Sequence, residues 1–256
     1  MIVPSGRRQT TPAPRSRPDV VRPTVRLCVA CALAAAATVA GGQPAKLPAS
    51  SVPERIPLQT SDAHDLTAWH YAIAEDATPL ATVILIHDLG GSHATVEPLA
   101  KQLRAAGCTV VAPDLRGHSA GRETARALKS ADFEMMAASR GGQKRDQAAV
   151  RGDVECVHGW IQAETAAGRL RAAPLVVVGS GLGAAIAVRW AVADAAWPDL
   201  ATGSQGRTVR GLVLIGPTFT TRGFTIGQTL AMEPVGRSLP VLVLSGADDR
   251  DAAAAA

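Results

Sequence analysis

Residues 175–184 read LVVVGSGLGA, the strongest indication of the fold in this sequence. Four consecutive apolar residues, three of them β-branched, are typical of a strand buried on both faces of a parallel sheet. Glycines at every second position then allow a tight turn in which backbone approaches backbone. The apolar run from Leu182 to Ala195 continues the chain as a helix. The stretch therefore predicts a strand, a sharp turn and a helix.

Outward from this stretch, short apolar strands alternate with helical segments. The expected strands are 82–86, 109–112, 175–178, 212–215 and 241–244, and the expected helices are 92–106, 150–166 and 182–195. Residues 55–73 predict an antiparallel pair with its turn at 61–65. This order predicts the α/β class, with a doubly wound, mostly parallel sheet and right-handed crossovers. Residues 130–146 are expected to form a solvated excursion.

The N-terminal segment has the layout of an export signal. Residues 1–40 hold six arginines and one acid and end in a run of 14 mostly apolar residues. That run is shorter than the roughly 20 residues of a membrane-spanning helix, so an uncleaved anchor ranks second. We expect an export signal at 1–40, a linker at 41–53 and a single domain at 54–256. The protein is then exported, and only the signal contacts a membrane.

The charge and the cysteine content of the chain argue against a nucleic-acid partner and against a metal site. The chain has 26 basic and 22 acidic residues, of which the signal holds 6 and 1, leaving 20 and 21. A nearly neutral domain gives no reason to expect nucleic-acid binding. Cys28 and Cys31 leave with the signal and lack the second pair of ligands that a zinc site needs. We expect no metal, and we expect Cys108 and Cys156 to be buried thiols.

Three further motifs follow predicted strands, namely HDLGGS at 87–92, PDLRGH at 113–118 and GADD at 246–249. Together with the turn at 179–183, they resemble the α/β-hydrolase superfamily in order and spacing. That family has an H-G-x-G-G oxyanion loop, a P-D-x-R-G-x-G turn, a G-x-S-x-G nucleophile elbow and a G-x-x-D acid turn. The resemblance covers about residues 55–250. It is closest to the lid-poor esterases, monoacylglycerol lipases and serine aminopeptidases.

The resemblance implies roles for residues around the elbow. The nucleophile position falls on Gly181, which has no side chain to attack an acyl carbon. The oxyanion would be held by the backbone amides of Leu89 and Leu182, with His87 and Asp88 lining the pocket. Asp88 stands where the family has glycine. Its carboxylate opposes the negative charge that develops on an oxyanion.

This sequence also departs from the family pattern at the positions of the catalytic acid and base. The acid turn supplies Asp249 as a vestigial acid, or less well Asp248, and a solvated turn explains this pair equally well. The family's histidine follows the acid, whereas all six histidines lie at or before His158. We interpret His87, His118 and His158 as a loop, a turn and a helix-surface residue.

The resemblance also implies a last strand and helix that the sequence does not supply. We therefore expect a degenerate, C-terminally shortened member of the family, with 241–244 as an edge strand. A second copy of the chain or another protein would cover that edge.

Ser180 is the alternative nucleophile. The elbow requires small residues two positions before and two after its apex. Glycines occupy both places around Gly181, whereas Val178 and Leu182 would flank Ser180. We interpret Ser180 as a cap of the following helix. The other candidate serines are poorer, namely Ser119 and Ser245.

The same glycines fit the dinucleotide fingerprint G-x-G-x-x-[GA], in which a pyrophosphate binds at a helix N-terminus. The next strand, 212–215, ends in Gly216 and Pro217 and offers no acidic residue for a ribose. We therefore expect no nucleotide and no other cofactor.

The sequence as a whole predicts an exported, non-catalytic α/β-hydrolase-like protein. Two alternatives stay open: an acyl or peptide hydrolase that uses Ser180, and a protein that binds a small molecule or an anion in the elbow pocket.

Overall fold

The computed structural model describes residues 52–74, 77–118, 128–140, 150–197, 206–218, 220–221, 224–232 and 235–246. The expected export signal and most of the linker lie outside these residues, as do Ser119, Asp248 and Asp249. Within the described ranges, no helix has both the length and the apolar character needed to span a bilayer.

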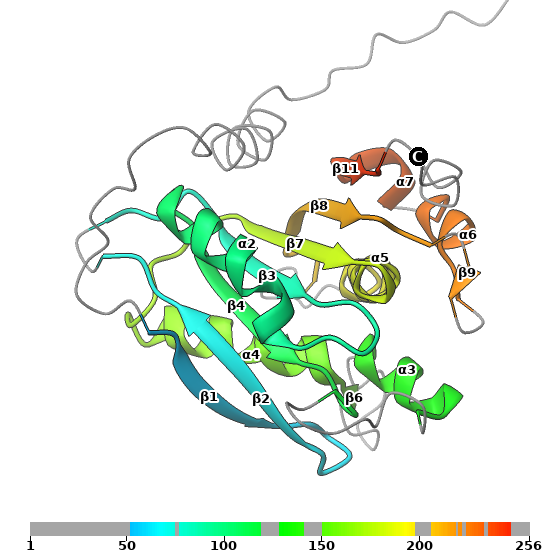
Figure 1. Ribbon diagram of the computed structural model, residues 1–256, viewed down its shortest axis with the longest axis horizontal. Helices are drawn as coiled ribbons and strands as arrows, with labels where there is room; N and C mark the ends of the chain where they lie inside the picture. The colour runs from blue at the N-terminus through cyan, green and yellow to red at the C-terminus, as the bar shows by residue number, and fades with distance from the viewer. Residues whose placement is uncertain are drawn as a thin grey trace, which may run out of the picture.

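A seven-stranded sheet forms the centre of the described structure (Figure 1). Its strands in spatial order are β1 (Glu54–Gln59), β2 (Asp65–Tyr71), β4 (Thr109–Asp114), β3 (Thr82–Ile86), β7 (Leu175–Ser180), β8 (Val209–Ile215) and β11 (Val241–Leu244). The β1–β2 and β2–β4 pairings are antiparallel, and every pairing from β4 to β11 is parallel. The doubly wound, mostly parallel sheet expected from the sequence is confirmed.

Helices cover both faces of this sheet (Figure 1). They are α2 (His93–Ala105), α3 (Ser130–Met136), α4 (Asp153–Ala166), α5 (Leu182–Ala195), α6 (Ile226–Leu230) and α7 (Val235–Ser238). Two short hairpins pair β5 (Ser139–Arg140) with β6 (Val150–Arg151) and β9 (Thr220–Thr221) with β10 (Phe224–Thr225).

Alternate residues of the central strands face two separate cores. Ile84 and Ile86 of β3 pack in the core that contains α4 and α5, whereas Val83 and Leu85 pack in the core that contains α2. Since both faces are covered, β3 is buried along its whole length. This burial explains why the strand has a continuous apolar sequence rather than an alternating one.

The region expected to be a solvated excursion is structured in its first part. Residues 130–136 form α3, in which Phe133 and Met136 are buried. Three positions apart on a helix, these side chains lie on one face and reach the core that contains α4 and α5. The expectation is therefore wrong for α3, and residues 141–149 lie outside the described part.

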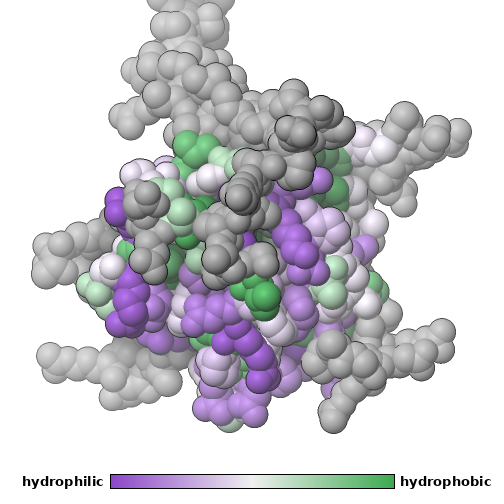
Figure 2. All heavy atoms as spheres, turned by 60° about the vertical axis from the view of Figure 1, so that its left-hand side comes forward, coloured by the Kyte–Doolittle hydropathy of each residue, from purple (hydrophilic) through white to green (hydrophobic). Residues whose placement is uncertain are grey.

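The two ends of the sheet differ in polarity. β1 exposes polar residues such as Glu54 and Arg55. Figure 2 brings the β1–β2 side of the molecule forward, and its described surface is mostly hydrophilic. At the other end, β11 pairs only with β8 among the described strands, and Val241 and Leu244 are 37% and 38% exposed. β11 is thus the edge of the described sheet.

Candidate functional site

The turn between β7 and α5 is a sharp elbow with Gly181 at its apex. Gly181 has a φ of 52° and a ψ of −115°, a conformation that L side chains rarely adopt. Ser180 comes one residue earlier, and its backbone still pairs with Ile215 of β8. The structure therefore places Gly181, and not Ser180, at the corner of the turn.

Close backbone contacts explain the glycines on either side of the apex. A Cβ on Gly179 would collide with the carbonyl group of Gly183. A Cβ on Gly183 would lie 2.5 Å from the carbonyl oxygen of His87. The end of β3, the end of β7 and the start of α5 thus meet backbone to backbone, which only small residues permit.

The loop from β3 to α2 lies directly beside this elbow. The backbone amides of Leu89 and Leu182 converge on one oxygen, because each donates a hydrogen bond to Asp88 Oδ1 at 2.7 Å. Such short N–H···O distances are typical of charge-assisted hydrogen bonds to a carboxylate. The carboxylate of Asp88 therefore lies between the two amides, whereas the sequence predicted only that it lines the pocket.

The same carboxylate also lies against the apex of the elbow. A Cβ built on Gly181 would collide with Cγ and with both carboxyl oxygens of Asp88. With Asp88 in this position, a side chain cannot fit at residue 181. The space that a nucleophile would need is occupied by Asp88.

His87 holds the loop at its first residue. Its side chain is buried, Nε2 accepts a hydrogen bond from the amide of Leu115 at 3.2 Å, and Nδ1 donates to the carbonyl oxygen of Asp88 at 2.7 Å. An imidazole with one accepting and one donating nitrogen is neutral. Burial accordingly lowers the pKa of His87 to about 4. Since both nitrogens are used, His87 anchors the loop rather than serving as a general base.

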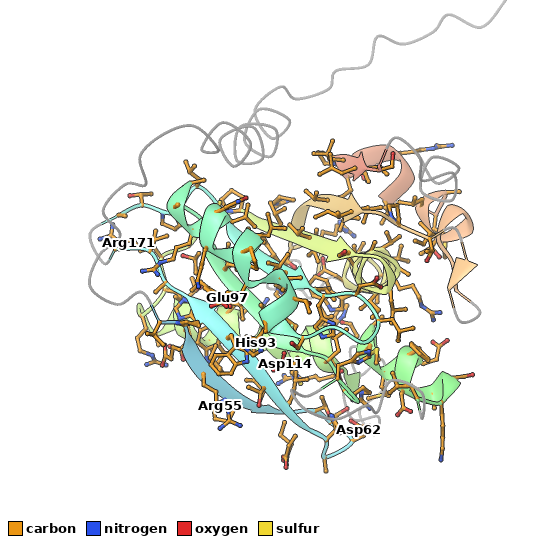
Figure 3. All side chains as sticks on the ribbon, in the orientation of Figure 1. Arg55, Asp62, His93, Glu97, Asp114 and Arg171 are labelled. Carbon is orange, nitrogen blue, oxygen red and sulfur yellow. The ribbon has the colours of Figure 1, made fainter. Side chains whose placement is uncertain are left out.

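Asp114 holds the other end of the same loop. Its Oδ1 accepts the backbone amide of His93 at 2.6 Å and lies 2.9 Å from His93 Nδ1. Its Oδ2 accepts the indole N–H of Trp69 at 3.1 Å, and the Trp69 and His93 rings stack with centroids 4.1 Å apart. His93 and Asp114 are labelled next to each other in Figure 3. His93 was not predicted from the sequence, because its role depends on its partners Trp69 in β2 and Asp114 in β4.

The turn after β4 is held by Arg116. Its Nε donates to Asp153 Oδ1 and its backbone amide to Asp153 Oδ2, both at 2.8 Å, while Nη1 donates to Asp62 Oδ2 at 2.8 Å. The hydrogen bond from Arg116 holds the pKa of the Asp62 carboxyl well below its usual range. This motif therefore fastens the β1–β2 turn and the start of α4 to the end of β4.

His158 does not lie on a helix surface, as the sequence analysis expected, but is buried in α4. Its Nδ1 lies 3.4 Å from Glu155 Oε1, and its ring packs edge-on against Trp190. It lines a cavity of about 470 Å³ together with Thr82 and Leu175, the first residues of β3 and β7. That cavity lies at the opposite end of these strands from the elbow, so His158 is not part of the elbow site.

The sequence of this chain matches a known family over the elements that form the site. Residues 83–255, well over half of the chain, match the model of the alpha/beta hydrolase family. The chain belongs to this family. No curated protein matches the sequence.

Several solved structures are similar to this chain at low sequence identity. A thermostable carboxyl esterase from Bacillus coagulans is 18% identical with a TM-score of 0.43, over 65% of this chain and 45% of its own. A lidless serine hydrolase from Xanthomonas campestris is 18% identical with a TM-score of 0.44, over 76% and 69%. A thermophilic carboxylesterase cloned from a metagenomic library is 19% identical with a TM-score of 0.45, over 84% and 62%.

This hydrolase-family chain is shorter than many of the structures that it matches. It spans 45% of the Bacillus coagulans esterase, 44% of a lipase and 22% of a puromycin hydrolase. Function depends on the residues of the site rather than on such similarity.

The structure brings most of the predicted site residues together. His87, Asp88, Leu89, Gly181 and Leu182 meet where the ends of β3 and β7 lie side by side. Ser180 adjoins them but lies within β7, and Asp249 is outside the described residues. As far as the described residues show, the site of this hydrolase-type fold consists of backbone amides, a glycine apex and the carboxylate of Asp88.

Proposed function

We propose that this α/β-hydrolase-family protein does not catalyse serine-type hydrolysis. The observation that carries the proposal is Gly181 at the positive-φ apex of the elbow. Acyl transfer by this family requires a hydroxyl at that corner, where it can reach an acyl carbon next to the oxyanion amides. The backbone of the elbow is formed, but it presents no nucleophilic atom.

Two features support this proposal against the use of Ser180. The backbone of Ser180 pairs with β8, which keeps the residue within the strand rather than at the corner. His87 is the imidazole nearest in sequence to the oxyanion amides, and both of its nitrogens are engaged in hydrogen bonds. A proton acceptor for a serine hydroxyl would have to come from elsewhere in the protein.

Labelling with a fluorophosphonate probe tests the proposal directly. The full chain, incubated with the probe beside an active esterase, is expected to show no serine adduct by intact mass spectrometry. An adduct that maps to Ser180 and disappears in Ser180→Ala would establish the serine-hydrolase alternative instead. Ser245→Ala is the matched control, since Ser245 is an exposed serine that is not part of the elbow.

We also propose that the protein is exported through residues 1–40. The basic leader followed by a short apolar run supports this proposal. Expression in a bacterial host with an export system is expected to give a mature protein whose N-terminus lies near residues 41–42. Recovery of only the full-length chain in the cytoplasm would contradict the proposal.

A further inference from the structure

We propose that Asp88 is an internal blocking group of the elbow site. Its carboxylate accepts hydrogen bonds from the amides of Leu89 and Leu182. These amides would otherwise bind the carboxylate or acyl oxygen of an external molecule. The proposal rests on the proposed function, because both concern the same elbow. It goes further by naming the group that keeps the site closed and the class of ligand that the group excludes.

The carboxylate oxygen Oδ1 of Asp88 lies where two backbone amides converge. Leu89 and Leu182 belong to segments 93 residues apart in the sequence, yet their amides donate to the same Asp88 Oδ1 at the same distance of 2.7 Å. Donors at 2.7–3.1 Å are what an oxyanion requires. Asp88 Oδ1 therefore lies where the oxygen of a bound ligand would have to be.

Asp88 competes with an external ligand for these two amides from within the same chain. It directly precedes Leu89, so its carboxylate loses little freedom on binding there. A tethered group acts at an effective concentration of about a millimolar or more. An external carboxylate with the same two hydrogen bonds must overcome that advantage and therefore binds the wild-type protein poorly.

The loop does not depend on the Asp88 side chain for its position. His87 is held by the amide of Leu115, and His93 is held by Asp114, at the two ends of the loop. Neither contact uses the Asp88 side chain, which is exposed. Removing the carboxylate should therefore vacate the two amides while Leu89 and Leu182 stay in place.

The ligand class follows from the blocking group itself. The Asp88 side chain beyond Cα is a methylene group with a carboxylate, which is acetate in shape and charge. A site that accepts this group accepts a short monocarboxylate, and the negative charge also suits the N-terminus of the 14-residue helix α5. Acetate is therefore the probe, and acetamide is its neutral counterpart.

The test compares wild-type protein with Asp88→Gly, both labelled with ¹⁵N-leucine. In Asp88→Gly, acetate is expected to shift the amide signals of Leu89 and Leu182 until they saturate, and acetamide is expected to shift them much less. The dissociation constant for acetate should fall at least about tenfold relative to wild type, because the tethered competitor is gone. Asp88→Ala serves as a second variant with the same expected result if Asp88→Gly does not fold.

Asp65→Ala is the matched control, because it removes one carboxylate from an exposed residue at the start of β2. Its affinity for acetate should equal that of wild type. If Asp65→Ala gains as much affinity as Asp88→Gly, the effect is one of net charge and the proposal is wrong. Signals that do not respond to acetate in a folded Asp88 variant, or that respond equally in wild type, also overturn it.

The two proposals fail through different observations. A fluorophosphonate adduct on wild-type protein would overturn the absence of catalysis without bearing on the acetate titration. Unresponsive leucine amides in folded Asp88 variants would overturn the blocking role of Asp88 while leaving Gly181 without a nucleophile.

Discussion

Two turns at the same edge of the sheet, one after β4 and one after β7, are built in opposite ways. In the turn after β4, the charged side chains of Asp114 and Arg116 find partners in β2, α2 and α4. In the elbow after β7, the apex is Gly181, and the neighbouring loop supplies a carboxylate that the amides of Leu89 and Leu182 hold. Side chains hold the first turn together, whereas the shape of the second depends on backbone contacts.

This contrast shows that the residues that position the site differ from the residue that would carry out its chemistry. The contacts of Asp114 and Arg116 position the loop and α4 whether or not a reaction takes place. The chemistry that the family carries out at the elbow depends on a single side chain, and a glycine at position 181 is compatible with the backbone of the turn. A chain can therefore keep the fold of its family without the nucleophile.

The largest effect is expected from breaking the turn after β4 with Asp153→Ala. Asp153 is fully buried and pairs with Arg116, which is 5% exposed. The substitution removes the buried one of the two carboxylates that pair with Arg116, and it leaves the backbone amide of Arg116 without its acceptor. We expect the free energy of unfolding to fall by about 3–5 kcal/mol, measured by urea denaturation. Asp62→Ala is the control: Asp62 is 42% exposed, and its loss should cost no more than about 1 kcal/mol. Equal effects of the two substitutions would contradict the assignment.

The next effect is a pH dependence that originates in His87. Its pKa is about 4 in the folded protein and about 6.5 when unfolded, so the unfolded chain binds more protons between these values. The stability due to neutral His87 is complete above pH 6.5 and is lost as the pH falls toward 4. This loss amounts to about 3 kcal/mol over the whole window and about 2 kcal/mol between pH 7 and pH 5.

Urea denaturation of wild type and His87→Gln at both pH values isolates this effect. The fall in the free energy of unfolding from pH 7 to pH 5 should be smaller in His87→Gln by the amount that His87 contributes. If both proteins lose the same free energy, His87 is not a buried neutral anchor.

A smaller effect is expected from placing a side chain at the elbow with Gly181→Ser. The new Cβ collides with the Asp88 carboxylate. The serine also has to adopt the positive φ of Gly181. We expect a cost of about 2 kcal/mol in the free energy of unfolding. In the double variant Asp88→Gly, Gly181→Ser the collision is removed and only the strain remains. A double-mutant cycle should then give a coupling of about 1 kcal/mol, and strict additivity would show that the two residues do not exclude each other.

The smallest effect concerns the start of α2, where the loop ends. Ser92 caps this helix, since its hydroxyl oxygen accepts the amide of Ala94 at 3.3 Å. The corresponding start of α5 has Gly181 as its N-cap, and not Ser180 as the sequence predicted, so the amide of Leu182 donates to Asp88 instead. Ser92→Ala should cost about 1 kcal/mol in thermal or urea unfolding. Thr165→Ala near the end of α4 provides a control outside the loop, and a larger loss there than at Ser92 would count against the cap.

Much of the fold could be predicted from local patterns. The strand at 82–86 and the helix at 182–195 lie where their apolar runs predict them, because burial on both faces requires an uninterrupted apolar sequence. The elbow was also predictable, since glycines at 179 and 183 satisfy contacts made within a few residues or with the adjacent strand. The burial of His158 was not predictable, because it depends on Glu155 and on Trp190 from another helix.

The main strands, the three long helices, the glycine at the elbow apex and the amides that face it could all be read from the residues along the chain. These features depend on residue type and on neighbours along the chain. The position of the Asp88 carboxylate between the amides of Leu89 and Leu182, and the anchoring of its loop by His87 and Asp114, depend on tertiary contacts. Such contacts join distant segments, and their geometry exists only after β3, β4 and β7 have paired in the sheet.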